Sequence, residues 1–254
     1  GSPRSAQPRN VDDPKYAIPW EIPNNKPFAL VIHAPYTINL AMPCKNGKRT
    51  IDIHSTYWFK CIINELLIAD KMGAMGVIIH VGKYTTQDPK EALKTMRTFI
   101  LAVLEKKCEL DIKSLLILET ASGQGTELLT NINELCVFYH SIVYQNNYKN
   151  HFRLCLDTCH VWSCGYGCLE SYKEIQSKTN FGIVCIHLNG SATPEGSHKD
   201  RHDQILSKKS SIPQHELIEM ISIVDDNVVI IIETPNEEEL EIDIDFVKNA
   251  MLKT

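Results

Sequence analysis

The sequence lacks an uninterrupted apolar stretch of about 18 residues, the length that a membrane-spanning helix needs. It also lacks the charged start, short apolar stretch and small-residue cleavage site of a secretory signal. No internal repeat or low-complexity tract is visible. These absences exclude integral membrane and repeat proteins, and we expect an intracellular protein that does not associate with a membrane.

Closely paired cysteines of the zinc-finger kind are missing too, although the chain has nine cysteines. Cys155 and Cys185 lie inside apolar runs, which is typical of reduced, buried thiols in a reducing compartment. Whether that compartment is cytoplasmic or nuclear does not follow from the sequence. The wide and irregular spacing of Cys155, Cys159, Cys164 and Cys168 disfavours a structural zinc knot.

An excess of positive charge is likewise absent. Lys and Arg number 26 against 31 Asp and Glu, which gives a formal net charge of −5. That balance excludes a generic basic nucleic-acid-binding protein. It does not exclude a phosphate substrate for a protein that holds several divalent cations, because bound cations change the local charge.

What the sequence does contain is a series of short, β-branched apolar runs separated by helical patterns. Asp88 followed by Pro89 marks the start of one predicted helix, at 88–106, and similar patterns cover 126–143 and 236–252. Uniformly apolar strands that alternate with helices predict a parallel sheet covered on both faces, here a TIM-type (β/α) barrel. The predicted strands are 28–32, 76–79, 115–118, 154–156, 183–186 and 228–232.

Each predicted strand is followed at once by His, Asp or Glu, and these residues are His33, His80, Glu119, Asp157, His187 and Glu233. The carboxyl ends of parallel strands meet at one rim, so we expect these side chains to converge. His160 follows closely after Asp157, and Asp200 and His202 share one side of an extended segment. Imidazoles and carboxylates together suit Zn²⁺ or Mn²⁺ in open, catalytic coordination, and nine ligands suit two or three ions.

The segments that carry these residues resemble, in order, the motifs of the endonuclease IV family of zinc-dependent apurinic/apyrimidinic (AP) endonucleases. They are HAPYTINLA from residue 33, HVG from 80, ETASGQG from 119, RLCLDTCH from 153, HLNGSATPEGSHKDRH from 187 and IIIETP from 230. The resemblance runs from about residue 28 to the end of the chain. SPRS at 2–5 is similar, more weakly, to a DNA-contacting loop of the family.

The resemblance implies an eight-stranded barrel with three Zn²⁺ ions, one of which could be Mn²⁺. The first ion would take His33, His80 and Glu119. The second would share Glu119 as a bridge and add Asp157, His187 and Glu233. The third would take His160, Asp200 and His202.

The resemblance also implies base excision repair of DNA. The expected reaction is hydrolysis of the phosphodiester 5′ to an abasic site in double-stranded DNA, which leaves a 3′-hydroxyl, together with cleaning of blocked 3′ ends. Glu233 would orient the attacking hydroxide and Glu119 would act beside it as the second catalytic residue. Arg4 and Tyr36 occupy positions where the family inserts side chains into the duplex.

Departures from the family pattern accompany these matches. We expect that two strands that the family has before residue 1 are missing from this chain. We expect a single barrel domain over 1–254, in which 1–27 form a loop or a partial N-terminal segment. Thr37 stands where the family has a larger apolar residue, Gly190 replaces an acid, and the segment 205–215 differs. We expect a monomer.

Two other functions stay open on the sequence. A sugar isomerase or epimerase barrel would use one or two divalent ions and would leave His160, Asp200 and His202 without a purpose. A non-catalytic remnant would bind zinc or damaged DNA without turnover. Trp162 is interpreted as a packing residue, and the histidines outside the ligand set are interpreted as surface or packing residues.

Overall fold

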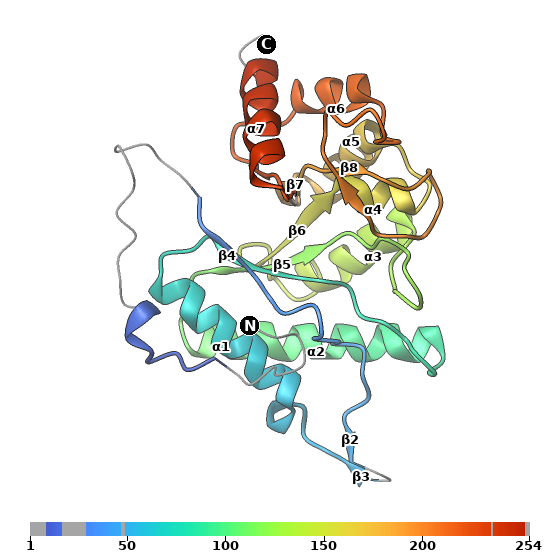
Figure 1. The fold of residues 1–254 in the computed structure, drawn as a ribbon. Helices are drawn as coiled ribbons and strands as arrows, with labels where there is room; N and C mark the ends of the chain where they lie inside the picture. Colours follow the sequence, from blue (N-terminus) through green and yellow to red (C-terminus); the bar gives the residue numbers. More distant parts are fainter. Residues whose placement is uncertain (1–8, 17–28, 47–48, 235, 252–254) are drawn as a thin grey trace. The chain divides into compact units, whose positions relative to one another are not determined.

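The computed structural model describes residues 9–16, 29–46, 49–234 and 236–251 (Figure 1). The chain divides into two units, one made of 1–118 and 141–153 and the other of 119–140 and 154–254. The division falls within two strands, β5 (Leu115–Glu119) and β6 (Phe152–Asp157).

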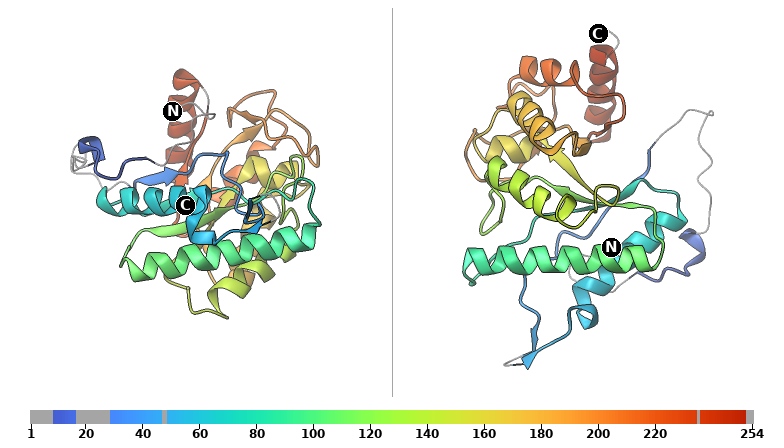
Figure 2. Two further views of the ribbon diagram at one scale, coloured as in Figure 1. Left: turned by 90° about the horizontal axis from the view of Figure 1, so that it is seen from below. Right: turned by 180° about the vertical axis from the view of Figure 1, so that it is seen from behind.

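In the first unit, three parallel strands pair in the order β1 (Val31–His33), β4 (Gly76–Ile79) and β5. Val31 lies opposite Gly76, and Gly76 lies opposite Leu115. Helices α1 (Tyr57–Lys71) and α2 (Pro89–Glu109) pack side by side, as Figure 2 shows from two further sides. The remaining elements are short: η1 (Pro14–Tyr16), β2 (Lys45–Asn46), β3 (Arg49–Thr50) and η3 (Ile53–Ser55).

The helices of this unit begin at capping side chains. Thr56 accepts a hydrogen bond from the Phe59 amide at the start of α1, and Asp88 accepts from the Lys90 and Glu91 amides at the start of α2. Such caps satisfy amides that have no partner within the helix. The predicted helix at 88–106 is confirmed, with its predicted cap, and continues to residue 109.

In the second unit, parallel strands pair in the order β6, β7 (Ile183–His187) and β10 (Val229–Ile231). Asp157 lies opposite His187, and His187 lies opposite Ile231, so the three strands finish almost level. An antiparallel pair, β8 (Gly190–Ser191) with β9 (His202–Asp203), follows β7. The helices are α3 (Ile132–Val143), α4 (Thr158–Ser163), α5 (Cys168–Thr179), α6 (Gln214–Ile221) and α7 (Glu237–Met251), and α3 passes into the first unit after His140.

The six predicted strands all occur, with bounds that differ by a few residues where the structure describes them. The predicted helix at 126–143 was wrong in its first part, since α3 begins only at Ile132. The Asn131 side chain accepts hydrogen bonds from the Asn133 and Glu134 amides and starts the helix there.

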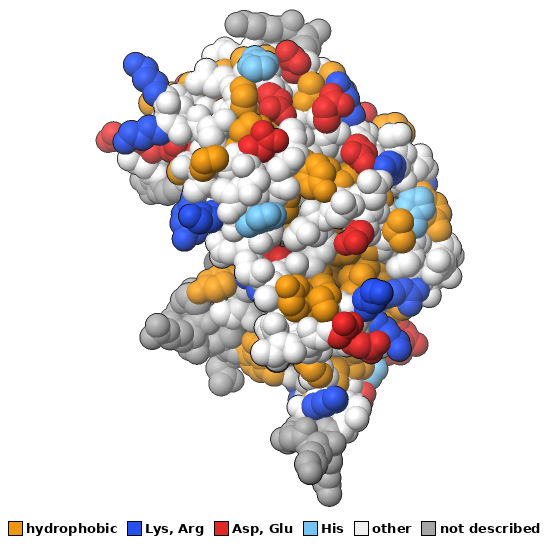
Figure 3. Space-filling model, turned by 90° about the vertical axis from the view of Figure 1, so that its right-hand side faces the viewer, with side chains coloured by type: hydrophobic (Ala, Val, Ile, Leu, Met, Phe, Trp, Pro, Cys, Tyr) orange, Lys and Arg blue, Asp and Glu red, His pale blue; other side chains and the backbone are white. Residues whose placement is uncertain are grey.

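The surface mixes both signs of charge. On the face drawn in Figure 3, acidic and basic side chains are interspersed. Among the described residues, no helix combines the length and apolar character needed to cross a membrane.

Candidate metal centre

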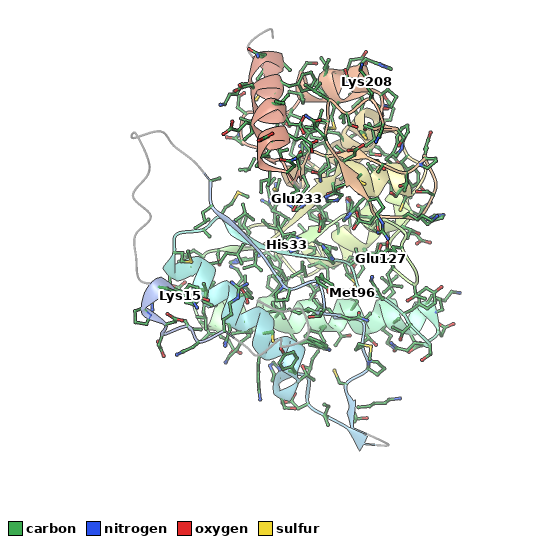
Figure 4. All side chains as sticks on the ribbon, viewed as in Figure 1. Lys15, His33, Met96, Glu127, Lys208 and Glu233 are labelled. Atoms are coloured by element: carbon green, nitrogen blue, oxygen red, sulfur yellow. The ribbon has the colours of Figure 1, made fainter. Side chains whose placement is uncertain are left out.

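One imidazole faces three carboxylates at the strand ends of the second unit. His187 Nδ1 lies 2.7 Å from Glu119 Oε1, 3.4 Å from Glu233 Oε2 and 3.7 Å from Asp157 Oδ2. Glu119, Asp157 and His187 are buried, whereas the Glu233 side chain, labelled in Figure 4, is 33% exposed. The level strand ends produce this convergence, as the sequence predicted for these four residues.

A second group lies beside the first and consists of two imidazoles around one carboxylate. Asp200 Oδ2 lies 3.4 Å from His160 Nε2, and Asp200 Oδ1 lies 3.2 Å from His202 Nε2. His202 Nε2 is also 3.5 Å from Asp157 Oδ2, so Asp157 belongs to both groups. His202 starts β9, and His160 lies on α4 directly after β6.

The hydrogen bond of His160 fixes which of its nitrogens can bind a metal. Its Nδ1 lies 2.8 Å from the Thr120 carbonyl oxygen, which can only accept. Nδ1 therefore carries a proton, and in the neutral ring Nε2 presents its lone pair toward Asp200. A backbone carbonyl behind a histidine is the usual arrangement for a metal ligand, because it holds the ring in one orientation.

The donor atoms fit divalent cations. Donor atoms of Asp157, His187 and Glu233 lie within 4.8 Å of one another, and so do those of Asp157, His160 and His202. His202 Nε2 is buried and makes no hydrogen bond within the described part of the chain, although carboxylate oxygens surround it. A buried polar atom without a hydrogen bond is costly, and a cation shared with those oxygens would remove the cost.

The ionisation of these side chains reflects the gathered negative charge. Burial alone would lower the pKa of His187, but its hydrogen bond to Glu119 and the charges of Glu119, Asp157 and Glu233 raise that pKa to about 10. For Asp200, burial would raise the pKa, but the neighbouring imidazoles of His160 and His202 hold that pKa well below its usual range instead. The cluster thus favours positive charge at its centre.

Asn189, which the sequence interpretation missed, connects two of the carboxylates. This buried side chain donates through Nδ2 to Asp157 Oδ2 at 2.9 Å and to Glu233 Oε2 at 3.3 Å. Its Oδ1 accepts from the Glu233 amide at 3.1 Å. Thr158 Oγ1 accepts from the Asn189 amide and donates to the Asn189 carbonyl. The signal in the sequence was the asparagine placed two residues after the strand-end His187.

Asp243 is a second missed residue and lies on α7, outside the cluster. Its buried carboxylate accepts hydrogen bonds from the Ile205 and Leu206 amides and from Thr234 Oγ1. Thr234 follows Glu233, and Ile205 follows closely after His202. One carboxylate therefore anchors the segments that carry two of the candidate ligands.

Two predicted ligands, His33 and His80, belong to the first unit. Their rings meet edge to face with centroids 4.9 Å apart, at the ends of neighbouring strands β1 and β4. That they share an ion with Glu119 stays a prediction. Tyr36 follows β1 and is 63% exposed, which leaves its ring accessible. Arg4 lies outside the described residues. Trp162 is buried and donates to Ser211 Oγ, as expected of a packing residue.

Comparison with known proteins shows the family to which this chain belongs. A family model described as "Xylose isomerase-like TIM barrel" matches residues 26–250. The "Probable endonuclease 4" of Mycoplasmopsis agalactiae is 33% identical over 215 residues, which cover 82% of this chain and 70% of that protein. The chain belongs to the endonuclease IV family. The "Probable endonuclease 4" of Mycoplasmopsis synoviae is similar at 32% identity, over 81% of this chain and 69% of that protein.

Solved structures agree with the fold of the endonuclease IV family. Endonuclease IV from Thermus thermophilus aligns with a TM-score of 0.67 at 21% identity, over 100% of this chain and 87% of that one. A D-tagatose 3-epimerase-like protein aligns with a TM-score of 0.69 at 19% identity, over 88% and 77%. At these identities the likeness concerns the fold, which is an α/β TIM-type barrel fold with six parallel strands among the described residues, as predicted.

Proposed function

We propose that the chain is an AP endonuclease. It hydrolyses the phosphodiester 5′ to an abasic site in double-stranded DNA, leaves a 3′-hydroxyl, and removes blocking groups from 3′ ends. The observation that carries the proposal is the pair of neighbouring donor groups that share Asp157. Adjacent divalent ions suit phosphodiester hydrolysis because both the attacking and the leaving oxygen need stabilisation.

The donor chemistry favours zinc. In the proposal, Glu119, Asp157, His187 and Glu233 hold one ion, and His160, Asp200 and His202 hold another. Imidazoles and carboxylates are ligands that catalytic zinc accepts, with a position left for water. When bound, such ions lower the pKa of water toward about 7 and polarise the phosphate.

The chain itself positions the reacting groups. Glu233 is the partly exposed carboxylate of its group, so it can accept a hydrogen bond from the attacking water and orient it. Asn189 holds Glu233 Oε2 and the Glu233 amide, which keeps the other carboxylate oxygen available. Tyr36 offers an accessible ring that can stack on bases exposed at the lesion, and Arg4 is proposed for the same contact.

Incision of a 5′-labelled duplex with one abasic site tests the proposal. We expect cleavage on the 5′ side of the lesion, loss of cleavage with a zinc chelator, and recovery when zinc is restored. Glu233→Gln should abolish cleavage, whereas Glu241→Gln, at an exposed position on α7, should not. Cleavage that survives the chelator, or that Glu233→Gln leaves intact, would contradict the proposal.

A sugar epimerase is the second candidate, favoured by the TM-score of 0.69 to the epimerase-like protein. An epimerase of this kind would need one or two ions, which leaves the group of His160, Asp200 and His202 unused. Metal analysis of the purified protein separates the two functions. An ion bound by His160, Asp200 and His202 favours the nuclease, and bound metal with that group empty favours the epimerase.

A further inference from the structure

Two thiols lie one layer beneath the strand ends of the second unit. Cys155 precedes Asp157 by two residues on β6, and Cys185 precedes His187 by two residues on β7. Side chains two apart along a strand share a face, so each thiol lies on the same face as the ligand above it. The two cysteines are partners in the strand register, and both are fully buried.

The thiols are close to each other and to His187. The two sulfur atoms and a ring nitrogen of His187 lie within 4.8 Å of one another. Apolar branched side chains usually fill the interior of such a barrel, so a buried pair of thiols with an imidazole above it is an unusual filling.

We propose that Cys155, Cys185 and His187 form a site for a thiophilic cation, such as Cd²⁺ or Cu⁺. Soft cations prefer sulfur ligands strongly over carboxylates, whereas the ligands above the thiols are oxygens and imidazoles. Binding forms two metal–sulfur bonds and one metal–nitrogen bond, and the protons that leave the two thiols and the imidazole nitrogen pass to solvent. In the proposal, the cation enters at the strand ends above the thiols, where the side chains of Asp200, His202 and Glu233 are partly exposed.

His187 connects this site to the carboxylates above it. Its Nδ1 is 2.7 Å from Glu119, so a cation on the thiols draws on an imidazole that the candidate metal centre uses. A thiophilic cation should therefore inhibit the protein by competing for His187. This consequence rests on the proposed function, whereas binding of the cation does not.

Titration of the zinc-loaded protein with Cd²⁺ tests the site. We expect an ultraviolet sulfur-to-cadmium charge-transfer band that Cys155→Ala/Cys185→Ala loses in large part. The control Cys61→Ala/Cys136→Ala removes two other buried cysteines, and its charge-transfer band should stay much stronger than that of Cys155→Ala/Cys185→Ala. Equal loss in the two double variants would overturn the site.

Cadmium NMR of the unmodified protein gives a measurement that does not depend on the folding of any variant. The chemical shift reports the number of sulfur ligands, and we expect a signal for two. Cadmium signals with only oxygen and nitrogen ligands would overturn the site.

Incision assays then separate the site from the proposed function. The competition for His187 is supported if Cd²⁺ inhibits incision by the unmodified protein and if Cys155→Ala/Cys185→Ala needs a several-fold higher Cd²⁺ concentration for the same inhibition. Equal inhibition of both would overturn that competition. If the zinc-loaded protein never cleaves, the proposed function fails, and the charge-transfer band and NMR signal still decide the thiol site.

Discussion

The candidate metal centre has an inner part and an outer part that the fold supports differently. The inner side chains Glu119, Asp157 and His187 are at most 2% exposed, whereas those of Asp200, His202 and Glu233 are 34%, 23% and 33% exposed. Glu119, Asp157 and His187 end strands of the parallel ladder. Asp200 and Glu233 lie outside strands, and His202 lies in the two-residue strand β9.

The difference shows which parts of the fold hold each candidate ligand in place. The backbone ladder of β6 and β7 places Asp157 opposite His187, and Asn189 then orients the Asp157 carboxylate. The outer ligands depend on Asn189 and Asp243, whose hydrogen bonds hold the segments around them. Inner substitutions should therefore disturb both folding and chemistry, and outer ones mainly the chemistry.

The largest effect is expected from Asp157→Ala. Its Oδ1 accepts from the His160 amide and caps α4, and its Oδ2 faces His187 and His202. Incision should fall by about a thousandfold or more, because several kcal/mol of transition-state stabilisation disappear. The zinc-loaded protein should also melt at a lower temperature, since loss of a helix cap alone costs about 1 kcal/mol.

Asp200→Ala is the matched change in the outer part. It should lower incision strongly, though no more than Asp157→Ala does, with a much smaller change in melting temperature because its side chain is partly exposed. Calorimetry of both zinc-loaded variants makes the comparison. Equal melting temperatures for the two variants would show that the distinction between inner and outer ligands is false.

A smaller effect is expected from Asn189→Ala. The substitution removes the donors that orient Asp157 and Glu233, and loss of such outer partners costs about 10- to 100-fold in metal affinity. Competition with a chromogenic zinc chelator measures that affinity. The exposed Asn133→Ala serves as the control, and unchanged affinity in Asn189→Ala would assign the asparagine to packing alone.

The smallest effect is expected from Asp243→Asn, which keeps the size of the side chain but replaces one acceptor oxygen with a donor. Urea unfolding should show a free energy of unfolding that is about 1–3 kcal/mol lower, because a buried amide or hydroxyl loses its hydrogen-bond partner. Thr234→Val removes a single one of these bonds and should cost less. Zinc affinity should fall less than in Asn189→Ala, and a larger fall would place Asp243 among the main supports of the site.

Much of the fold, and the meeting of several candidate ligands, could be predicted from the order of residues in the sequence. A buried strand followed by His, Asp or Glu is visible in the residue order, and the level strand ends brought Glu119, Asp157, His187 and Glu233 together as expected. The two-residue spacing of Asp200 and His202 likewise predicted that their side chains lie on the same side of the segment. These predictions depend on the two-residue period of strands and on the rule that the carboxyl ends of parallel strands meet at one rim.

The supporting residues could not be predicted, because their roles depend on distant parts of the chain. Asp243 and Asp245 are both acids on α7, yet Asp243 is fully buried and Asp245 is 75% exposed. The partners of Asp243 come from residues 205, 206 and 234. Similarly, α3 starts where Asn131 caps it, and the sequence alone did not show which residue would be the cap.

The short helix after β6 fixes the spacing of two candidate ligands. Asp157 and His160, proposed for different ions, are separated by one turn of backbone that Asp157 itself caps. A turn of α-helix rises about 5.4 Å, and its geometry hardly varies. Asp157 and His160 are joined within four consecutive residues, so an insertion or deletion there would shift one proposed ligand relative to the other without removing either of them.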